Sequence, residues 1–264
     1  MNDQLSARER RDLIARHVHE RRRVQVTELM EEFGLTDTSI RRDLTILEDK
    51  GLIRRVHGGA VSTNEGLHSS VLEDRILQHG LEKRKIGAAA AQYILPHEVI
   101  FLDTGSTVLH VARSIPDSIK QLGSLRIVTN STLLLDEIGM WATPNLILLG
   151  GIFLPDHWAT VGPEVLDALK QYSAHHAFLS CDGLTLEGGI TTAHPLIAQA
   201  EREMANRSEQ VIVLADHSKL GRSGFVPIMP VSEIDILITD SGASEEMVAE
   251  LCGRGVEVVV VPMG

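Results

Sequence analysis

The sequence predicts an α/β protein in which a winged helix-turn-helix precedes a mainly parallel α/β domain. Residues 24–61 combine two short amphipathic helical segments with a glycine-bounded hairpin. From residue 81 onward, short β-branched runs alternate with amphipathic helical segments, which is typical of a parallel sheet covered on both faces. We therefore expect a first domain at 1–61, a linker at 62–80 and a second domain at 81–264.

Apolar spacing predicts the two helices of the helix-turn-helix. One helical face of the first carries Val26, Leu29, Met30 and Phe33. Gly34 can end this helix in a left-handed conformation, and a second helix can begin after Leu35 with Thr36 or Asp37 as its cap. The apolar face of the second helix carries Ile40, Leu44 and Leu47.

The opposite face of the second helix suits the major groove of DNA. It carries Thr38, Arg42 and Thr45, with Ser39 and Arg41 on its flanks. Arg can form two hydrogen bonds to guanine, while Thr and Ser can bond base edges or phosphates. An isolated Arg pair is usually part of a solvated face, but the position of this pair at the start of a second helix favours DNA contact.

A short hairpin after the second helix forms a predicted wing. Gly51 ends the helix, residues 52–56 resemble a strand, and residues 58–59 form a glycine turn. The wing carries three further candidate contacts to the sugar-phosphate backbone or the minor groove: Arg54, Arg55 and His57. The basic run at 21–23 is either another phosphate contact or a solvated turn.

Charge is divided unevenly between the two predicted domains. Residues 1–61 carry 12 Lys+Arg and 11 Asp+Glu, a net +1, whereas residues 62–264 carry 13 and 25, a net −12. DNA would repel the acidic region, so binding should depend on local arginines and fall steeply with salt.

Composition favours a cytoplasmic protein without a metal centre. No apolar run reaches the ~18 residues that span a bilayer, and no secretory leader is recognisable. The only cysteines, Cys181 and Cys252, fit a reducing compartment. The 12 His residues are scattered, and the adjacent His175 and His176 would point to different sides of a strand. We therefore predict no metal ligands and no cofactor.

Strands and helices alternate through the second domain. The strands are expected at 99–103, 125–129, 146–149, 177–180, 211–215, 235–239 and 256–261. The helices are expected at 81–94, 107–115, 131–140, 163–172, 196–206 and 244–252. Ligands of such sheets bind beyond the carboxyl ends of the strands.

Polar residues gather at those predicted strand ends. Ser106 and Thr107 follow the first strand at a helix N-terminus, where phosphate is favoured, although a simple N-cap explains them as well. Asp103 or Asp182 can accept hydrogen bonds from sugar hydroxyls, and Lys219 can pair with a phosphate or lie in a solvated loop. The other polar strand ends are Thr129-Asn130-Ser131 and Gly150-Gly151, of which the glycine pair also suits a plain tight turn.

Motifs along essentially the whole chain resemble the DeoR/GlpR family of bacterial transcriptional regulators. They are VTELMEEFG and TSIRRDLTILEDKGLIRRVHGGAV, followed in order by FLDTGST, IVTNS, LLGG, VGP, DGL and VLADHSKLG. The resemblance implies a sensor domain similar in fold to ribose-5-phosphate isomerase that binds a phosphorylated sugar or polyol. It also implies repression of a sugar-catabolic operon until this effector accumulates.

The resemblance assigns roles residue by residue. It implies DNA contact by Ser39, Arg41, Arg42, Arg54, Arg55 and His57. It implies effector contact by Asp103, Gly105, Ser106, Thr107, Thr129, Asn130, Ser131, Gly150, Gly151, Asp182, Gly183, Thr191 and Lys219. After GITT, many members carry an Asn-Leu-Glu-Glu type of segment, whereas this chain has AHPLI at 193–197 and then Gln199. Two acidic positions are apolar, which indicates a distinct ligand subclass.

Two other classes of function compete with a metabolite-responsive repressor: an enzyme, and a protein whose second domain only mediates assembly. In a sugar-phosphate isomerase fused to a DNA-binding module, Asp103, Asp182 or Asp216 would be the general base, but such an enzyme gains nothing from residues 24–61. A dehydrogenase is disfavoured because no GxGxxG follows the first strand of the second domain. Alternatively, the second domain only mediates assembly. We expect no enzyme, and a homodimer or homotetramer that reads paired half-sites of double-stranded operator DNA.

Overall fold

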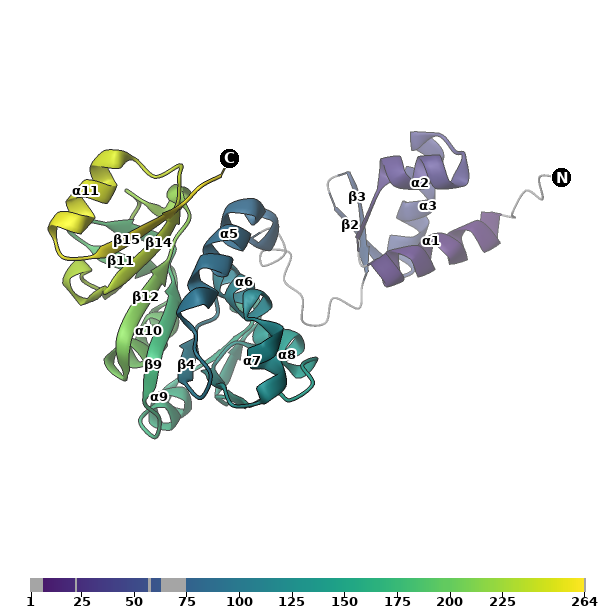
Figure 1. Ribbon diagram of the computed structural model, residues 1–264. Helices are drawn as coiled ribbons and strands as arrows, with labels where there is room; N and C mark the ends of the chain where they lie inside the picture. The colour runs from purple at the N-terminus through teal and green to yellow at the C-terminus, as the bar shows by residue number, and fades with distance from the viewer. Residues whose placement is uncertain (1–6, 22, 57, 63–74, 264) are drawn as a thin grey trace. The chain divides into compact units, whose positions relative to one another are not determined.

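The computed structural model describes residues 7–21, 23–56, 58–62 and 75–263 (Figure 1). The chain divides into two compact units, an N-terminal unit at 1–68 and a C-terminal unit at 69–264. Much of the predicted linker at 62–80 lies outside the described residues, so its bounds stay a prediction. His57 of the predicted wing and Arg22 of the basic run also lie outside them.

The N-terminal unit confirms the predicted winged helix-turn-helix. Its elements are α1 (Ala7–Arg21), β1 (Arg23–Gln25), α2 (Val26–Phe33), α3 (Asp37–Asp49), β2 (Ile53–Val56) and β3 (Gly59–Ser62). Gly34 has φ 63° and ends α2 as predicted, because a residue without Cβ adopts this left-handed conformation at little cost. The strands form an antiparallel sheet in the order β1-β3-β2, so the wing hairpin is joined by a third strand.

Helix α1 and strand β1 were not anticipated from the sequence. Ile14 and Val18 of α1 are fully buried against the helix-turn-helix core, which contains Leu29, Leu44 and Ile53. This helix also carries several charged residues, which weakens its apolar pattern. Tertiary packing against the other helices therefore stabilises α1 more than its own pattern predicts.

The C-terminal unit contains a parallel sheet of seven strands in the order β15-β14-β12-β9-β4-β5-β6. These strands are β4 (Val99–Leu102), β5 (Arg126–Thr129), β6 (Leu146–Leu148), β9 (Ala174–Ser180), β12 (Ser208–Leu214), β14 (Ile236–Asp240) and β15 (Glu257–Val261). Each overlaps a predicted strand. The predicted mainly parallel α/β domain is therefore confirmed.

Helices cover both faces of this sheet (Figure 1). They are α5 (Gly80–Ala90), α6 (Ser106–Ser114), α7 (Asp117–Leu122), α8 (Thr132–Gly139), α9 (Pro163–Leu169), α10 (Pro195–Asn206) and α11 (Glu245–Gly253). Alternate strand residues point to opposite layers: Ile212 packs with α5, α6 and α8, and its neighbour Val213 packs with α9, α10 and α11. Short 3₁₀ turns lie at Ala91–Tyr93, Pro155–His157, His217–Lys219 and Val231–Glu233.

Two small antiparallel sheets were not expected. Strands β10 (Gly183–Thr185), β11 (Gly189–Thr192) and β13 (Val226–Met229) form one, and β7 (Ile152–Leu154) pairs with β8 (Ala159–Val161) in the other. Strands of three or four residues are too short to show a clear period of two. They matter because β10 and β11 hold the loop that follows β9.

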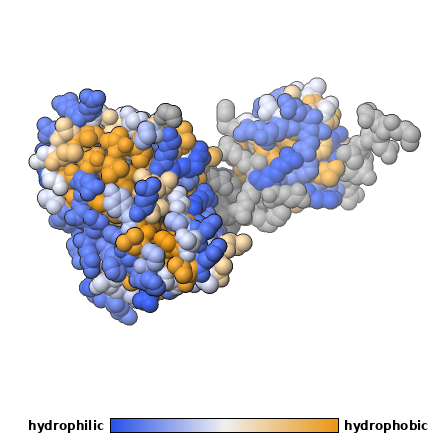
Figure 2. All heavy atoms as spheres, in the orientation of Figure 1, coloured by the Kyte–Doolittle hydropathy of each residue, from blue (hydrophilic) through white to orange (hydrophobic). Residues whose placement is uncertain are grey.

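Both apolar and polar areas lie on the visible face of the C-terminal unit (Figure 2). The most exposed large hydrophobic side chains among the described residues are Met140 at 86% and Phe225 at 83%. None of the helices in the described part of the chain combines the length and apolarity needed to cross a bilayer.

Candidate functional site

Helix α3 presents the predicted DNA-reading residues in the N-terminal unit. Thr38, Arg41 and Arg42 are exposed, while Ser39 and Thr45 are half-buried on the same helix. Arg54 and Arg55 are exposed on β2. The structure therefore places these predicted contacts on α3 and on the strand that follows it.

Hydrogen bonds connect some of these α3 and β2 residues to neighbouring side chains of the same unit. Arg41 Nε donates to Asp37 Oδ1 at 2.6 Å, and this hydrogen bond and the carboxylate charge raise the pKa of the Arg41 guanidinium. One guanidinium N–H of Arg55 donates to Thr45 Oγ1 at 2.7 Å, which links β2 to α3. The backbone N–H of Arg55 donates to Glu48 Oε1 at 2.7 Å. These bonds orient both arginines before any partner is bound.

A buried carboxylate joins α1 to α3. Asp43 is 3% exposed, and its Oδ2 accepts a hydrogen bond of 2.7 Å from Arg10 Nε, while Arg11 lies 3.7 Å away. Arg10, Arg11 and Arg42 line one shallow hollow. Sequence reasoning missed the two α1 arginines. The sequence signal that could have indicated them was Asp43, because a carboxylate next to Leu44 and three residues after Ile40 lies on the apolar face of the helix and needs a cationic partner.

The C-terminal unit holds a pocket at the carboxyl edge of the parallel sheet. Its walls come from the segment before α5 and α5 itself, the β4–α6 loop, the end of β9, the end of β11, α10, and the 3₁₀ turn after β12. The lining residues are Arg75, Gln78, Lys83, Thr104, Gly105, Ser106, Thr107, His157, Ser180, Cys181, Asp182, Thr192, Glu201 and Lys219.

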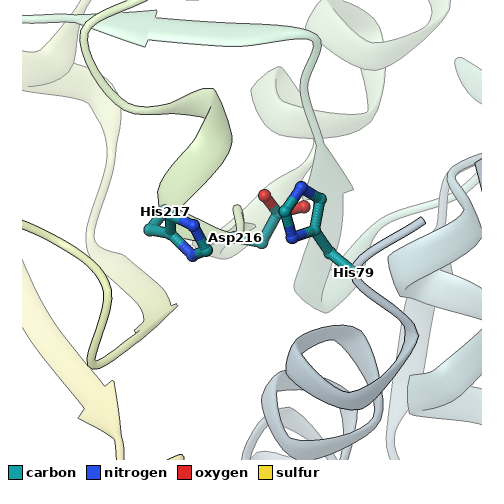
Figure 3. Close-up of side chains that lie close together, drawn as sticks. All are labelled: His79, Asp216 and His217. Carbon is teal, nitrogen blue, oxygen red and sulfur yellow. The ribbon is translucent and has the colours of Figure 1, made fainter.

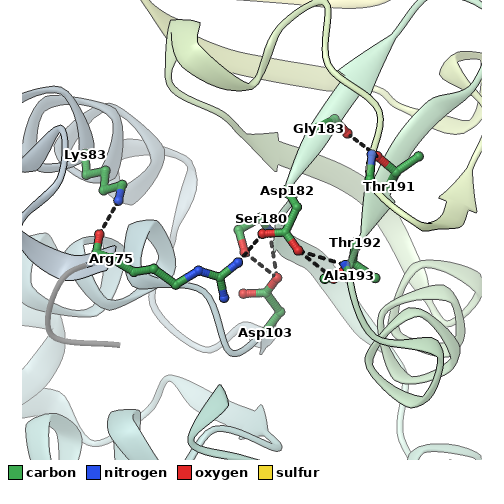
Figure 4. Close-up of polar contacts among 10 residues, drawn as sticks. Arg75, Lys83, Asp103, Ser180, Asp182, Gly183, Thr191, Thr192 and Ala193 are labelled. Atoms are coloured by element: carbon green, nitrogen blue, oxygen red, sulfur yellow. Dashed lines mark hydrogen bonds and ion pairs between the residues drawn. The ribbon is translucent and has the colours of Figure 1, made fainter. Parts of the chain in front are cut away.

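Asp103 organises the loop at the N-terminus of α6. Its Oδ1 accepts from the Gly105 N–H at 2.7 Å, and its Oδ2 accepts from the Ser180 N–H and Oγ at 2.6 and 2.9 Å (Figure 4). A Cβ on Gly105 would lie 1.9 Å from Ser180 Oγ, so this approach needs glycine. Asp103 is therefore a positioning residue beside the pocket, and Gly105, Ser106 and Thr107 line it.

Three cationic side chains line the same pocket as this helix N-terminus. Lys219 was predicted, but Arg75 and Lys83 were not. Arg75 forms an ion pair with Asp182, and Lys83 Nζ donates to the Arg75 carbonyl (Figure 4). Burial lowers the pKa of Lys83 to about 8, although the nearby Asp216 charge opposes this effect. The only sequence signal for Lys83 was a lysine in a helix rich in small residues.

A second buried carboxyl group, that of Glu201, adjoins Asp103 in the pocket wall. Burial raises the pKa of both groups, and that of Glu201 lies well above its ordinary value of 4.5. The charge of Asp103 and a side-chain hydrogen bond to it favour the protonated form of Glu201 further. Glu201 was missed, although it lies in the buried face of α10 between Ile197 and Met204.

Several predicted effector residues make contacts within the fold and do not line the pocket. Thr129 Oγ1 donates to the Leu102 carbonyl at 2.6 Å, and Asn130 Nδ2 donates to the Thr160 carbonyl at 2.8 Å. The backbone N–H of Ser131 donates to Thr129 Oγ1. Thr191 Oγ1 donates to the Gly183 carbonyl and accepts from the Gly224 N–H. Gly150 and Gly151 form an exposed turn before β7. Of the predicted set, the pocket brings together Gly105, Ser106, Thr107, Asp182 and Lys219.

Two family models match the two regions just described. A DeoR-like helix-turn-helix domain matches residues 10–66, and the DeoR C terminal sensor domain matches residues 78–241. The chain belongs to the DeoR family of transcriptional regulators. As a DeoR-family member it is a DNA-binding regulator, and the pocket lies within its sensor domain.

Named relatives match this DeoR-family chain over most of its length. The HTH-type transcriptional regulator GlpR of Haloferax volcanii is 33% identical over 89% of this chain and 90% of its own length. The putative aga operon transcriptional repressor of Escherichia coli O157:H7 is 30% identical over 96% and 93%, respectively. The HTH-type transcriptional repressor GlcR of Bacillus subtilis is 33% identical over 83% of each chain.

Solved structures also match about half of this chain. Ribose 5-phosphate isomerase A of Methanocaldococcus jannaschii is 19% identical, with a TM-score of 0.40 over 54% of this chain and 55% of the isomerase. Ribose 5-phosphate isomerase of Plasmodium falciparum is 21% identical, with a TM-score of 0.39 over 53% and 52%.

Proposed function

We propose that this regulator represses an operon of carbohydrate or polyol catabolism, and that a phosphorylated sugar or polyol in the sensor pocket releases it from DNA. One observation carries the proposal: Arg75, Lys83 and Lys219 line the same pocket as the N-terminus of α6. Cations and free backbone N–H groups together favour a phosphate dianion.

The two sides of the pocket suit the two ends of such a molecule. Ser106 and Thr107 add hydroxyl donors to the helix terminus on the phosphate side. Asp182 and Glu201 supply carboxyl groups that can bond sugar or polyol hydroxyls. A neutral Glu201 whose proton is shared with Asp103 would still accept a hydrogen bond from a hydroxyl, and it would add no second anion to the pocket. Relatives named as repressors, including GlcR and the putative aga operon repressor, agree with the proposed direction of regulation.

Release from DNA requires that the effector bind two states of the protein with different affinities. We propose a homodimer or homotetramer, because one helix-turn-helix covers few base pairs and paired half-sites need two copies. We also propose that the protein acts in the cytoplasm and is no enzyme. An NMR time course should accordingly detect no interconversion of an added sugar phosphate.

Anisotropy of a labelled DNA fragment from upstream of the gene tests this proposal. A panel of phosphorylated sugars and polyols is titrated into the complex, and at least one member should release the DNA. Lys219→Ala and Thr107→Val should each raise the effector concentration needed for release, because each removes a group facing the phosphate. Lys170→Ala, an exposed lysine on the surface beyond α9, is the matched control. If both variants released the DNA at the same effector concentration as the wild type, the assigned pocket would be refuted.

A further inference from the structure

We propose that His79, Asp216 and His217 form a binding site for a divalent transition-metal ion, best suited to Zn²⁺, beside the sensor pocket. None of the three is among the pocket-lining residues. His79 precedes α5, while Asp216 and His217 follow β12, so the site joins segments far apart in the sequence (Figure 3). This separation explains why the spacing of histidines along the chain did not predict it.

The three side chains already converge. One potential ligand atom from each lies within 4.8 Å of those of the other two. The two imidazole rings meet edge to face with centroids 5.2 Å apart, and the Asp216 carboxyl group lies beside the His79 ring (Figure 3). Two zinc bonds of about 2.1 Å span at most about 4.2 Å, so small side-chain rotations would complete the coordination.

Asp216 has a carboxylate oxygen that lacks a partner. The residue is 1% exposed, and its Oδ1 accepts from the Ser218 N–H at 3.0 Å. Its Oδ2 is buried without a hydrogen-bond partner among the described residues. The charge of Asp216 acts on the Lys83 ammonium, whose Nζ donates to the Arg75 carbonyl, but Lys83 makes no hydrogen bond to Oδ2. A buried carboxylate oxygen without a donor is unfavourable, and a metal ion would satisfy it.

A carboxylate orients the His217 ring, as is usual for histidines that bind metal ions. Its Nδ1 lies 2.9 Å from Asp240 Oδ1, and Asp240 is itself 1% exposed. Asp240 also accepts the backbone N–H groups of His217 and Gly242, at 2.8 Å each, so the carboxylate is fixed. A proton on Nδ1 leaves the lone pair on Nε2 for a metal. Such carboxylate–histidine pairs orient the ring and strengthen it as a ligand.

His79 has a left-handed backbone conformation where the chain enters α5. Its φ is 54°, in the left-handed region that non-glycine residues rarely adopt. Its Nδ1 lies 3.8 Å from Glu82 Oε1, which provides a second carboxylate beside an imidazole. Two imidazoles and one carboxylate form a three-ligand set that leaves a fourth position for water. A bound ion would connect the start of α5 to the segment after β12, and these segments supply Lys83 and Lys219 to the pocket.

Zinc titration of the metal-free full-length protein against a chromophoric chelator tests the site. The wild type should bind one Zn²⁺ per chain at this site, and Mg²⁺ should not compete. His79→Asn and His217→Gln should each weaken binding at least ~10-fold, since each removes an imidazole. His97→Asn is the matched control because His97 is exposed and has a similar φ of 71°. Unchanged zinc affinity in both site variants, or an equal loss in the control, would overturn the proposal.

X-ray absorption by the wild-type zinc complex gives a readout that needs no variant. Imidazole scattering from two histidines together with oxygen ligands supports the site. A spectrum without imidazole scattering, or the absence of zinc binding by the wild type, overturns it. This result is independent of operator binding and of any sugar phosphate.

Discussion

The carboxyl group of Glu201 on α10 is buried next to that of Asp103 at the end of β4, and a side-chain hydrogen bond joins them. Asp103 accepts three hydrogen bonds from Gly105 and Ser180, whereas Glu201 Oε2 has no partner among the described residues. Burial and the neighbouring Asp103 charge therefore raise the pKa of Glu201 well above its ordinary value. This arrangement makes the stability of the sensor domain depend on pH.

Glu201→Gln should stabilise the protein increasingly as pH rises. Unfolded Glu201 loses its proton near its ordinary pKa of 4.5, whereas the folded group keeps it well above that value. The folded state thus binds more protons in this range, and wild-type stability falls as pH rises toward the folded pKa. Gln keeps a donor toward Asp103 but cannot ionise. Thermal unfolding from about pH 5 to about pH 8 should show a growing difference in Tm. Glu209→Gln, at an exposed position, is the control, and a constant difference for Glu201→Gln would contradict the assignment.

Asp43→Asn should loosen the packing of α1 on α3. The substitution weakens the charge-assisted hydrogen bond from Arg10 and removes the ion pair with Arg11 at a carboxylate that is 3% exposed. Hydrogen bonds to charged groups contribute about 1.5–3 kcal/mol, so amides of both helices should exchange with solvent at least about tenfold faster. Hydrogen exchange followed by mass spectrometry measures this. Asp37→Asn removes the exposed Asp37–Arg41 pair and should leave exchange nearly unchanged. Equal exchange rates in the two variants would be inconsistent with a structural role for Asp43.

Gly87→Ala should destabilise the contact between α5 and α6. A Cβ at Gly87 would lie 2.5 Å from the carbonyl carbon of His110 and 2.6 Å from its Cβ. The helices must move apart, which typically costs about 1–3 kcal/mol. Gly139→Ala on α8 is the control, because its Cβ would meet nothing within 4 Å and alanine favours a helix. Calorimetry should therefore show a lower Tm for the first variant only, and similar values for both would exclude close helix contact at Gly87.

Arg42→Ala should weaken binding to operator DNA. Arg42 is exposed on α3 and lines the hollow that also contains Arg10 and Arg11. Loss of a base contact by arginine costs about 1–3 kcal/mol, or roughly 5- to 150-fold in affinity. Anisotropy at several salt concentrations measures this change. Arg113→Ala, on α6 in the other unit, should retain wild-type affinity. Unchanged operator affinity in Arg42→Ala would rule out the recognition-helix assignment.

Strongly periodic segments were predictable from the sequence. The strands that became β4, β5, β6, β9, β12, β14 and β15 were each expected, because short continuous apolar runs between helical segments are typical of a parallel sheet covered on both faces. Helix α1 and the small sheets were not, because α1 has a weak apolar stripe and the short strands have no clear period. Gly34 was predictable because its role is local: it ends a helix in a left-handed conformation.

Pocket residues were predicted from the sequence only where they closely follow a strand along the chain. Four of these residues closely follow a strand, so chain order alone placed them at one edge of the sheet: Ser106 and Thr107 in the first turn of α6, Asp182 after β9, and Lys219 in the 3₁₀ turn after β12. Arg75 reaches the pocket from the segment before α5, through an ion pair with a residue far along the chain. No local pattern encodes such a contact.

The sequence by itself determined the two folds, and it predicted which helix carries the candidate DNA contacts and at which edge of the sheet the pocket lies. These follow from periodicity and chain order, which are local properties. Only the tertiary structure decided that burial lowers the pKa of Lys83 to about 8, that burial beside Asp103 raises the pKa of Glu201, and that His79 meets His217. Burial and charge proximity depend on residues brought together from distant segments, so the protonation and ligand chemistry of this site exist only in the folded chain.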